Sequence, residues 1–203
     1  MKSSLFILMA MLLSLPVLAD SIDSGVYYAA EKSFNTDSKF ELRLGTGYDF
    51  SNPYLNVFSL QGGGYYLLDS QMALGLEGTA YTSTHRGSYE ELIKQFGSAG
   101  LAVSVNSPQY KVSAGFRVTP ISGFVNVLSS KIVKANINLI GRVGAVQYSG
   151  RSLGPVLGGA LETQIEITPH TGIFTQISWD FEKPGSDSWQ GRSGFLIGPS
   201  FRL

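Results

Sequence analysis

Apolar and polar residues alternate along most of this 203-residue chain. In the stretch KFELRLGTGYDF, at 39–50, the apolar side chains from Phe40 to Phe50 occupy even positions, whereas Glu41, Arg43 and Asp49 occupy odd positions. Successive side chains of a β-strand point to opposite faces of the sheet. The spacing therefore predicts a strand with one apolar face and one polar face.

The same alternation, or a looser form of it, recurs in further segments and predicts eight strands in all. Their expected ranges are 39–50, 55–68, 72–84, 110–128, 133–145, 155–167, 172–182 and 192–203. The second, fourth and sixth strands are followed by short links, whereas the other links are longer or richer in turn residues. An even number of antiparallel strands, with tight turns on one side and larger loops on the other, is typical of an outer-membrane β-barrel. We therefore expect an all-β fold, a transmembrane antiparallel up-and-down barrel.

A soluble β-sandwich is the alternative, because its strands alternate in the same way. The polar face favours the barrel, since it carries acids and bases in balance, as the narrow interior of a small barrel requires. The acids predicted to point inward are Glu41, Asp49, Glu77, Glu162, Glu166, Asp180 and Glu182. The bases predicted to point inward are Arg43, Lys111, Arg117, Lys134, Arg142, Arg192 and Arg202. We interpret them as an ion-pair network that fills the lumen. A filled lumen argues against a general porin, because it leaves no open channel.

The first residues have the features of a secretory signal. Lys2 precedes an apolar run from Leu5 to Leu15, and the small residue Ala19 follows a few positions later. The run is short for a transmembrane anchor, and acidic residues rather than basic ones follow it. We expect a signal peptide at 1–19, a periplasmic segment at 20–37 and the barrel at 38–203.

Composition narrows the chemistry further. The chain has no Cys, so an exported protein would do without disulfides here. The formal net charge is zero, which gives no electrostatic basis for binding nucleic acid, and the spacings of phosphate-binding loops, dinucleotide-binding turns and zinc fingers are missing. We expect no cofactor and no metal.

The end of the printed sequence, GFLIGPSFRL, alternates strongly. Its pattern of Gly198, Phe201 and Leu203 resembles the C-terminal recognition pattern of outer-membrane proteins, which the barrel-assembly machinery of Gram-negative bacteria reads. Many such signals end on Phe where this one ends on Leu203, and Pro199 is unusual within a strand. The resemblance implies residence in the outer membrane of a Gram-negative bacterium, with lipid and lipopolysaccharide around the barrel. The short links lie on the same side as both termini, which we therefore expect to be periplasmic.

The central segment 118–145 resembles the outer membrane β-barrel domain family common in myxobacteria and related predatory bacteria. The positions that match are Pro120, Gly123, Lys131, Ile132, Val133, Gly141 and Gly144. That family usually has an aromatic residue followed by Gly-Lys in the first of these strands, and here Ser122 and Phe124 replace the flanking positions. The resemblance implies a fold and a location, and little chemistry.

An enzyme remains the alternative function, because some eight-stranded outer-membrane barrels modify lipid A. His85 lies at the expected outer end of the third strand, with Ser83, Ser88 and Glu90 nearby. A lipid-modifying hydrolase would use Ser88 or Ser83 as nucleophile, His85 as base and Glu90 as the acid. His170 lies in a predicted periplasmic turn and does not fit that arrangement. We favour a non-enzymatic structural or interaction role.

The loop at 85–109 offers a second kind of interaction. It contains the one plausible helix, from about Tyr89 to Phe96, and apolar residues that need cover from the barrel rim, lipid or another protein. We expect these residues to pack across the mouth of the barrel, and an envelope protein partner bound through this loop is the alternative. A narrow channel or a ligand-binding barrel is a further alternative.

Overall fold

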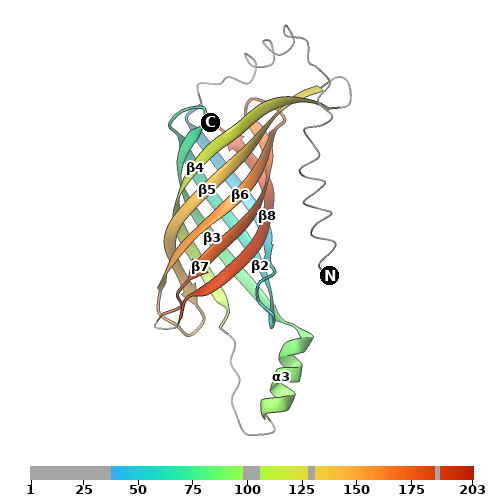
Figure 1. Cartoon of the computed structure of the whole chain (residues 1–203), viewed down its shortest axis with the longest axis vertical. Helices are drawn as coiled ribbons and strands as arrows, with labels where there is room; N and C mark the ends of the chain where they lie inside the picture. Colours follow the sequence, from blue (N-terminus) through green and yellow to red (C-terminus); the bar gives the residue numbers. More distant parts are fainter. Residues whose placement is uncertain (1–37, 98–105, 128–130, 186–187) are drawn as a thin grey trace.

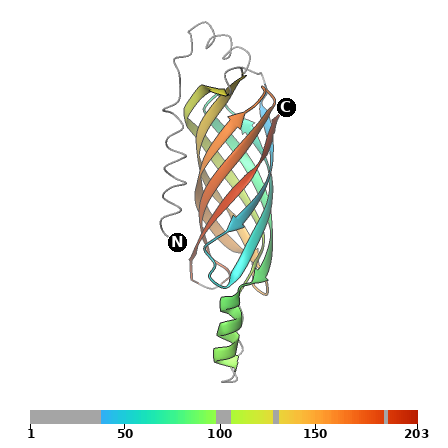
Figure 2. The same ribbon diagram turned by 90° about the vertical axis from the view of Figure 1, so that its right-hand side faces the viewer.

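The computed structural model describes residues 38–97, 106–127, 131–185 and 188–203 of the chain, and it forms a closed barrel of eight antiparallel strands (Figures 1 and 2). Each strand pairs with the next along the chain, and β8 pairs with β1. The strands are β1 (Phe40–Asp49), β2 (Leu55–Leu67), β3 (Met72–His85), β4 (Pro108–Val127), β5 (Lys131–Tyr148), β6 (Gly154–Glu166), β7 (Thr171–Glu182) and β8 (Gln190–Arg202). The predicted fold class is confirmed. The sandwich alternative is wrong, because one sheet closes on itself. The expected signal peptide and segment 20–37 lie outside the described residues.

The two ends of the barrel differ. At one end, which we call the turn end, β1 begins, β8 finishes, and β2–β3, β4–β5 and β6–β7 are connected. At the other, the loop end, α3 (Gly87–Gly97) follows β3 and stands clear of the barrel wall (Figures 1 and 2). This helix extends the predicted one by a residue or two at each end, with Glu90 in its first turn and Lys94 in its last, as the helix dipole favours. Within the described ranges, no helix is long and apolar enough to cross a membrane.

The β4–β5 hairpin is longer than its neighbours. β4 pairs with β3 only as far as Val118, and β5 pairs with β6 only from Lys134, so the tip of the hairpin projects past both at the turn end (Figure 1). The register shifts between Val118 and Ile121. Pro120 lies inside this irregularity, where its missing N–H removes a ladder hydrogen bond. The shift turns Ser122 inward, where its hydroxyl donates to Asn136 at 2.7 Å. The sequence predicted the short link and missed the projection.

The seam between β1 and β8 closes the barrel. Leu203 N–H donates to the Phe40 carbonyl at 2.9 Å, and the register runs from Glu41 with Arg202 to Asp49 with Gly194. Gly198 makes the close approach possible, because a Cβ there would lie 1.9 Å from the Leu44 carbonyl oxygen. This gives Gly198 a structural role beyond its place in the predicted assembly signal.

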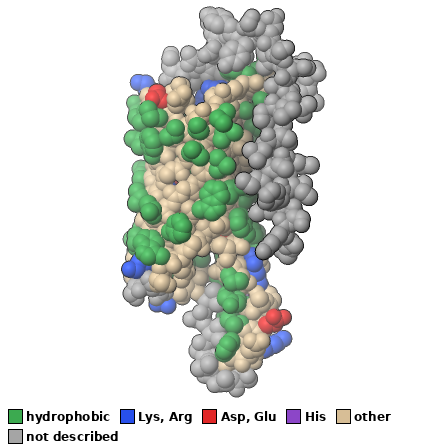
Figure 3. Space-filling view, viewed as in Figure 1, with side chains coloured by type: hydrophobic (Ala, Val, Ile, Leu, Met, Phe, Trp, Pro, Cys, Tyr) green, Lys and Arg blue, Asp and Glu red, His purple; other side chains and the backbone are tan. Residues whose placement is uncertain are grey.

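The barrel has polar contents and an apolar outer surface. Figure 3 shows apolar side chains on one face of the wall. The exposed apolar residues of the strands include Leu42, Phe58, Leu60, Leu74, Leu76, Val112, Phe116, Leu139, Val143, Leu157, Leu161, Ile173, Phe195 and Ile197. Charged side chains are buried inside it, among them Glu41, Arg43, Asp49, Glu77, Lys111, Arg117, Arg142, Glu162, Glu166, Asp180 and Glu182. This distribution is the reverse of that in a water-soluble protein.

Candidate functional site

An ion-pair network fills the half of the lumen nearest the turn end. Glu41 on β1 and Glu162 on β6 are fully buried, and Arg43 joins them. The Arg43 Nε donates to Glu41 at 2.5 Å, and its two terminal nitrogens both donate to Glu162, one of them at 2.9 Å. From β4, Arg117 donates to both carboxylate oxygens of Glu41, at 2.8 and 3.1 Å. Four residues from three strands, β1, β4 and β6, thus form one charge-compensated cluster.

Polar side chains complete this network toward the turn end. Arg202 donates to both oxygens of Glu166, at 2.5 and 3.1 Å. Asn136 donates to Glu166 at 2.6 Å, and Asn138 donates to Glu162 at 2.7 Å. Paired and hydrogen-bonded charges of this kind avoid the large cost of an isolated buried charge.

Two buried aromatic rings lie on the loop-end side of the network and close the middle of the barrel. The Arg43 guanidinium lies 4.8 Å from the Tyr65 ring centre and 5.0 Å from that of Phe174, and Arg117 lies 4.8 Å from Tyr65. The Tyr65 hydroxyl donates to Glu77. Gly75 leaves room for this ring, because a Cβ there would lie 2.6 Å from it. The rings and the cations stabilise each other through cation–π contacts.

A second group of ion pairs lies toward the loop end. Lys111 contacts Asp180 at 2.5 Å, and the Arg192 Nε donates to Asp49 at 2.7 Å. The Tyr148 hydroxyl donates to Glu182 at 2.5 Å. Tyr81 lies between two of the cations, with its ring centre 4.9 Å from Arg192 and 6.0 Å from Lys111.

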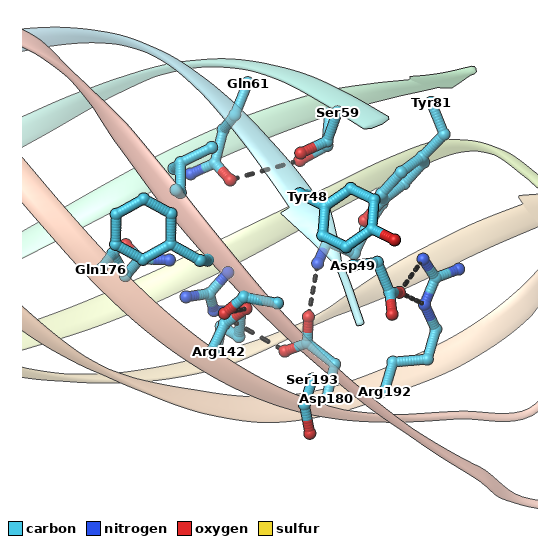
Figure 4. Close-up of a pocket in the computed structure, with 16 residues that line it drawn as sticks. Tyr48, Asp49, Ser59, Gln61, Tyr81, Arg142, Gln176, Asp180, Arg192 and Ser193 are labelled. Carbon is cyan, nitrogen blue, oxygen red and sulfur yellow. Dashed lines mark hydrogen bonds and ion pairs between the residues drawn. The ribbon is translucent and has the colours of Figure 1, made fainter. Parts of the chain in front are cut away.

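Arg142 lies between the two groups and is paired less tightly than its neighbours. Its closest carboxylate oxygens are Glu77 Oε2 at 3.5 Å and Asp180 Oδ1 at 3.9 Å, and its side chain is 1% exposed. Its Nε and Nη2 have no hydrogen-bond partner among the described atoms, and neither has Gln176 Oε1. Arg142 and Gln176 face the same pocket (Figure 4). The half of the lumen near the loop end is therefore less completely filled than the other half.

The structure places the predicted lumen residues inside the barrel, with one difference. Lys134 is only half-buried near the turn end and forms no ion pair with the described residues. It lies close to the projecting tip of the β4–β5 hairpin, where the wall no longer encloses it. The other six predicted bases all pair with inward carboxylates; they are Arg43, Lys111, Arg117, Arg142, Arg192 and Arg202.

The alternation of the strands places Asn136, Asn138 and Gln164 on polar faces, whereas sequence reasoning missed the aromatic residues Tyr65, Phe174 and Tyr148. All six are buried. The aromatic residues could have been found from their parity, because each shares its strand face with an inward charged or polar residue. Their partners could not be inferred, because these depend on how far the strands are staggered around the barrel.

The residues predicted for a hydrolase contact other partners rather than one another. The Ser88 hydroxyl donates to the Pro53 carbonyl at 2.7 Å, and the His85 ring stacks on Tyr89 with centres 4.1 Å apart. Glu90 is exposed in the first turn of α3. Within the described part of the chain, no hydrogen bond joins Ser88 to His85 or His85 to Glu90, and no group of three acidic, His or Cys side chains is placed to hold a metal ion.

Comparison with known proteins finds likeness at the level of the fold. No protein-family model and no curated protein matches the chain. Among solved structures, it is similar to the Neisserial surface protein A, with 13% identity, coverage of 82% of this chain and 98% of that one, and a TM-score of 0.48. It is also similar to Ail, the attachment invasion locus protein of Yersinia pestis, with 12% identity, coverage of 82% and 97%, and a TM-score of 0.37. A de novo designed transmembrane β-barrel gives 11% identity, coverage of 83% and 98%, and a TM-score of 0.45.

Proposed function

We propose that this chain is an integral protein of the Gram-negative outer membrane, with a closed lumen and a structural or interaction role in the envelope. One observation carries the proposal: the barrel exposes its large apolar side chains and buries its charges. In water, that surface would cost free energy over most of the wall. In a bilayer the same residues lie against hydrocarbon, and the closed sheet leaves no unpaired strand edge there.

Aromatic residues near the strand ends support the same placement. Phe40 and Tyr66 pack edge to face at the turn end, with ring centres 5.2 Å apart, and Phe201 is exposed beside them in register with Leu42. Toward the loop end, Trp179 and Phe181 are exposed. Aromatic girdles at both interfaces flank the apolar band of membrane barrels. The barrel axis would then run across the membrane, with the turn end and both termini facing the periplasm.

Biogenesis through the barrel-assembly machinery is part of this proposal. The supporting feature is the terminal pattern of Gly198, Phe201 and Leu203, which lies in and just after the strand that closes the barrel. Membership of the outer-membrane family common in myxobacteria and related predatory bacteria is the finer proposal. It rests on the resemblance of segment 118–145.

The proposed role is non-enzymatic, and contact with other envelope components would occur at the loop end. The supporting feature is α3, which stands clear of the wall (Figure 1). Its side chains Ile93 and Phe96 are exposed. Lipopolysaccharide would surround the barrel near this end, and an envelope protein could bind the loop.

For the hydrolase alternative, lipid A from cells producing the protein is compared with lipid A from cells producing His85→Ala. Identical lipid A profiles support the non-enzymatic role, whereas a modification lost in the variant contradicts it.

The test of the placement is fractionation of expressing cells combined with gel migration of the purified protein. We expect the protein in the outer-membrane fraction, soluble only in detergent, with an unheated band that migrates differently from the boiled one because the closed sheet resists unfolding. A protein that remains soluble and monomeric without detergent would contradict the proposal.

A further inference from the structure

The lumen contains a polar chamber between the aromatic rings at its middle and the loop end. The space within it that a water-sized molecule can occupy is about 40 Å³. Its lining comes from β1, β2, β3, β4, β5, β7 and β8, so it lies on the barrel axis rather than in the wall. Figure 4 shows Arg142, Gln176, Asp180 and Arg192 around this space.

The chamber contains hydrogen-bonding groups of both kinds that lack partners. Arg142 Nε and Nη2 are unused donors, and Gln176 Oε1 and Asp180 Oδ1 are unused acceptors. All three residues are at most 4% exposed. A buried polar group without a partner costs about 1–3 kcal/mol, so groups facing a common space indicate something that bonds to them.

The distances around Arg142 show that its donors are free to bond to that occupant. Its contacts with Glu77 Oε2 and Asp180 Oδ1, at 3.5 and 3.9 Å, are too long for good direct hydrogen bonds. Both oxygens lack a hydrogen-bond partner, so a molecule beside them can accept from Arg142 and donate to the carboxylates.

The pairing of the charges bears on the chemical class. Each lining cation pairs with a buried carboxylate: Lys111 with Asp180, Arg142 with Glu77, and Arg192 with Asp49 and Glu182. Among the described lining residues, no cation is thus left over for an anion. The unused donors of Arg142 and the unused acceptors of Gln176 and Asp180 fit an occupant that both accepts and donates hydrogen bonds.

The chamber is open on one side only. Asp49 and Arg192, whose side chains are 8% and 11% exposed, lie at the loop end, where β1 finishes and β8 begins. On the other side lie Tyr65 and Phe174, each at most 2% exposed, and beyond them the hydrogen-bonded network around Arg43.

We infer that the barrel holds an aqueous chamber that is closed at one end and is reached from the loop end. It binds water or a small molecule with the hydrogen-bonding capacity of water. This occupant accepts hydrogen bonds from Arg142 and donates them to Asp180 and Gln176. The half of the lumen near the turn end is dry. Buried waters with two to four polar partners are a regular part of protein structure, and this lining offers such partners.

The absence of Cys from the chain allows a direct test by cysteine labelling. Gln176→Cys places a thiol in the chamber, and Gln164→Cys places one in the dry network on the neighbouring strand. The two glutamines are a matched pair, because both are 2% exposed and both point inward. They differ in that Gln164 donates to Ser200 at 3.2 Å, whereas Gln176 Oε1 is unpartnered. Each variant is folded in detergent micelles and exposed to methyl methanethiosulfonate, a small uncharged reagent. Modification is followed by intact mass.

We expect Gln176→Cys to react at least about tenfold faster than Gln164→Cys, because a thiol in dry packing reacts only when the barrel opens locally. Ser149→Cys, on the exposed β5–β6 loop, gives the rate of an open site. Heat-dependent gel migration shows that each variant has folded. If Gln176→Cys is as protected as Gln164→Cys, the chamber is not hydrated; if both react rapidly, the lumen is wet throughout. Either result overturns the inference. The experiment uses the barrel in micelles, so its failure is distinct from failure of the proposed location in the cell.

Discussion

At the residue scale, the lumen is held by charges that depend on one another. Arg43 contacts two fully buried carboxylates, Glu41 and Glu162, and its guanidinium is 4% exposed. A buried ion pair is weak evidence of net stabilisation, because desolvating both partners offsets their attraction. Removing one partner lowers the stability, because the remaining charge is still desolvated and no longer has an opposite charge beside it. The network is therefore sensitive to single substitutions.

The substitution Arg43→Met should lower the free energy of unfolding by about 3–5 kcal/mol, because Glu162 and Glu41 then share too few donors. Urea unfolding in lipid vesicles, followed by Trp fluorescence, measures the change. Thr46→Ala on the outer face of the same strand is the control, and it should change the free energy by less than about 0.5 kcal/mol. Equal effects of the two substitutions would show that the network contributes nothing specific.

Gly198 is a second sensitive residue, for steric rather than electrostatic reasons. In Gly198→Ala the new methyl group would collide with the Leu44 carbonyl, at 1.9 Å, and push β8 away from β1. We expect a marked loss of the folded band in refolding assays analysed on unheated gels. Gly141→Ala is the matched control, because a Cβ there meets nothing within 4 Å. Normal folding of Gly198→Ala would contradict the close approach at the seam.

At the element scale, the strands follow from the sequence because alternation has a period of two and each face has one environment. From Glu41 to Glu182, every acid predicted to point inward is buried. Parity failed to predict the β4–β5 hairpin, where the irregularity near Pro120 shifts the register and exposes Lys134 to a partly open environment. Pairings across the lumen, such as Arg43 with Glu162, depend on strand tilt and stagger, which a single sequence does not display. The chamber at Arg142 was missed for the same reason.

The outward face of β5 can be tested by placing a charge on it. Leu139 is exposed midway along β5, so Leu139→Arg should destabilise the barrel by about 2–4 kcal/mol in a bilayer, where a charge at the midplane is costly. Leu153→Arg, on the exposed β5–β6 loop, should cost about 0–1 kcal/mol. Unfolding titrations of both variants in the same vesicles give the comparison. Similar costs at the two positions would mean that β5 does not face lipid.

At the scale of the whole molecule, the barrel is stabilised without disulfides. Its hydrogen-bond ladder is closed, which leaves no free edge along the wall, and its interior charges are compensated within each half of the lumen. The two halves differ, since the half near the turn end is packed and hydrogen-bonded and the half near the loop end contains the chamber. A solute entering from the loop end meets Tyr65 and Phe174 and then the network around Arg43. On the proposed placement, we therefore expect the molecule to be a closed membrane barrel rather than a pore.

The most direct test of a membrane barrel with a closed lumen is the conductance of planar bilayers that contain the refolded protein. The heat-dependent shift in gel migration shows that the same preparation is folded, and co-flotation of the protein with lipid vesicles in a density gradient shows that it inserts. We predict that the current stays at the level of protein-free membranes, because the network around Arg43 and the rings of Tyr65 and Phe174 block the lumen near its middle. Steady, ion-selective currents that scale with the amount of inserted protein would contradict the account.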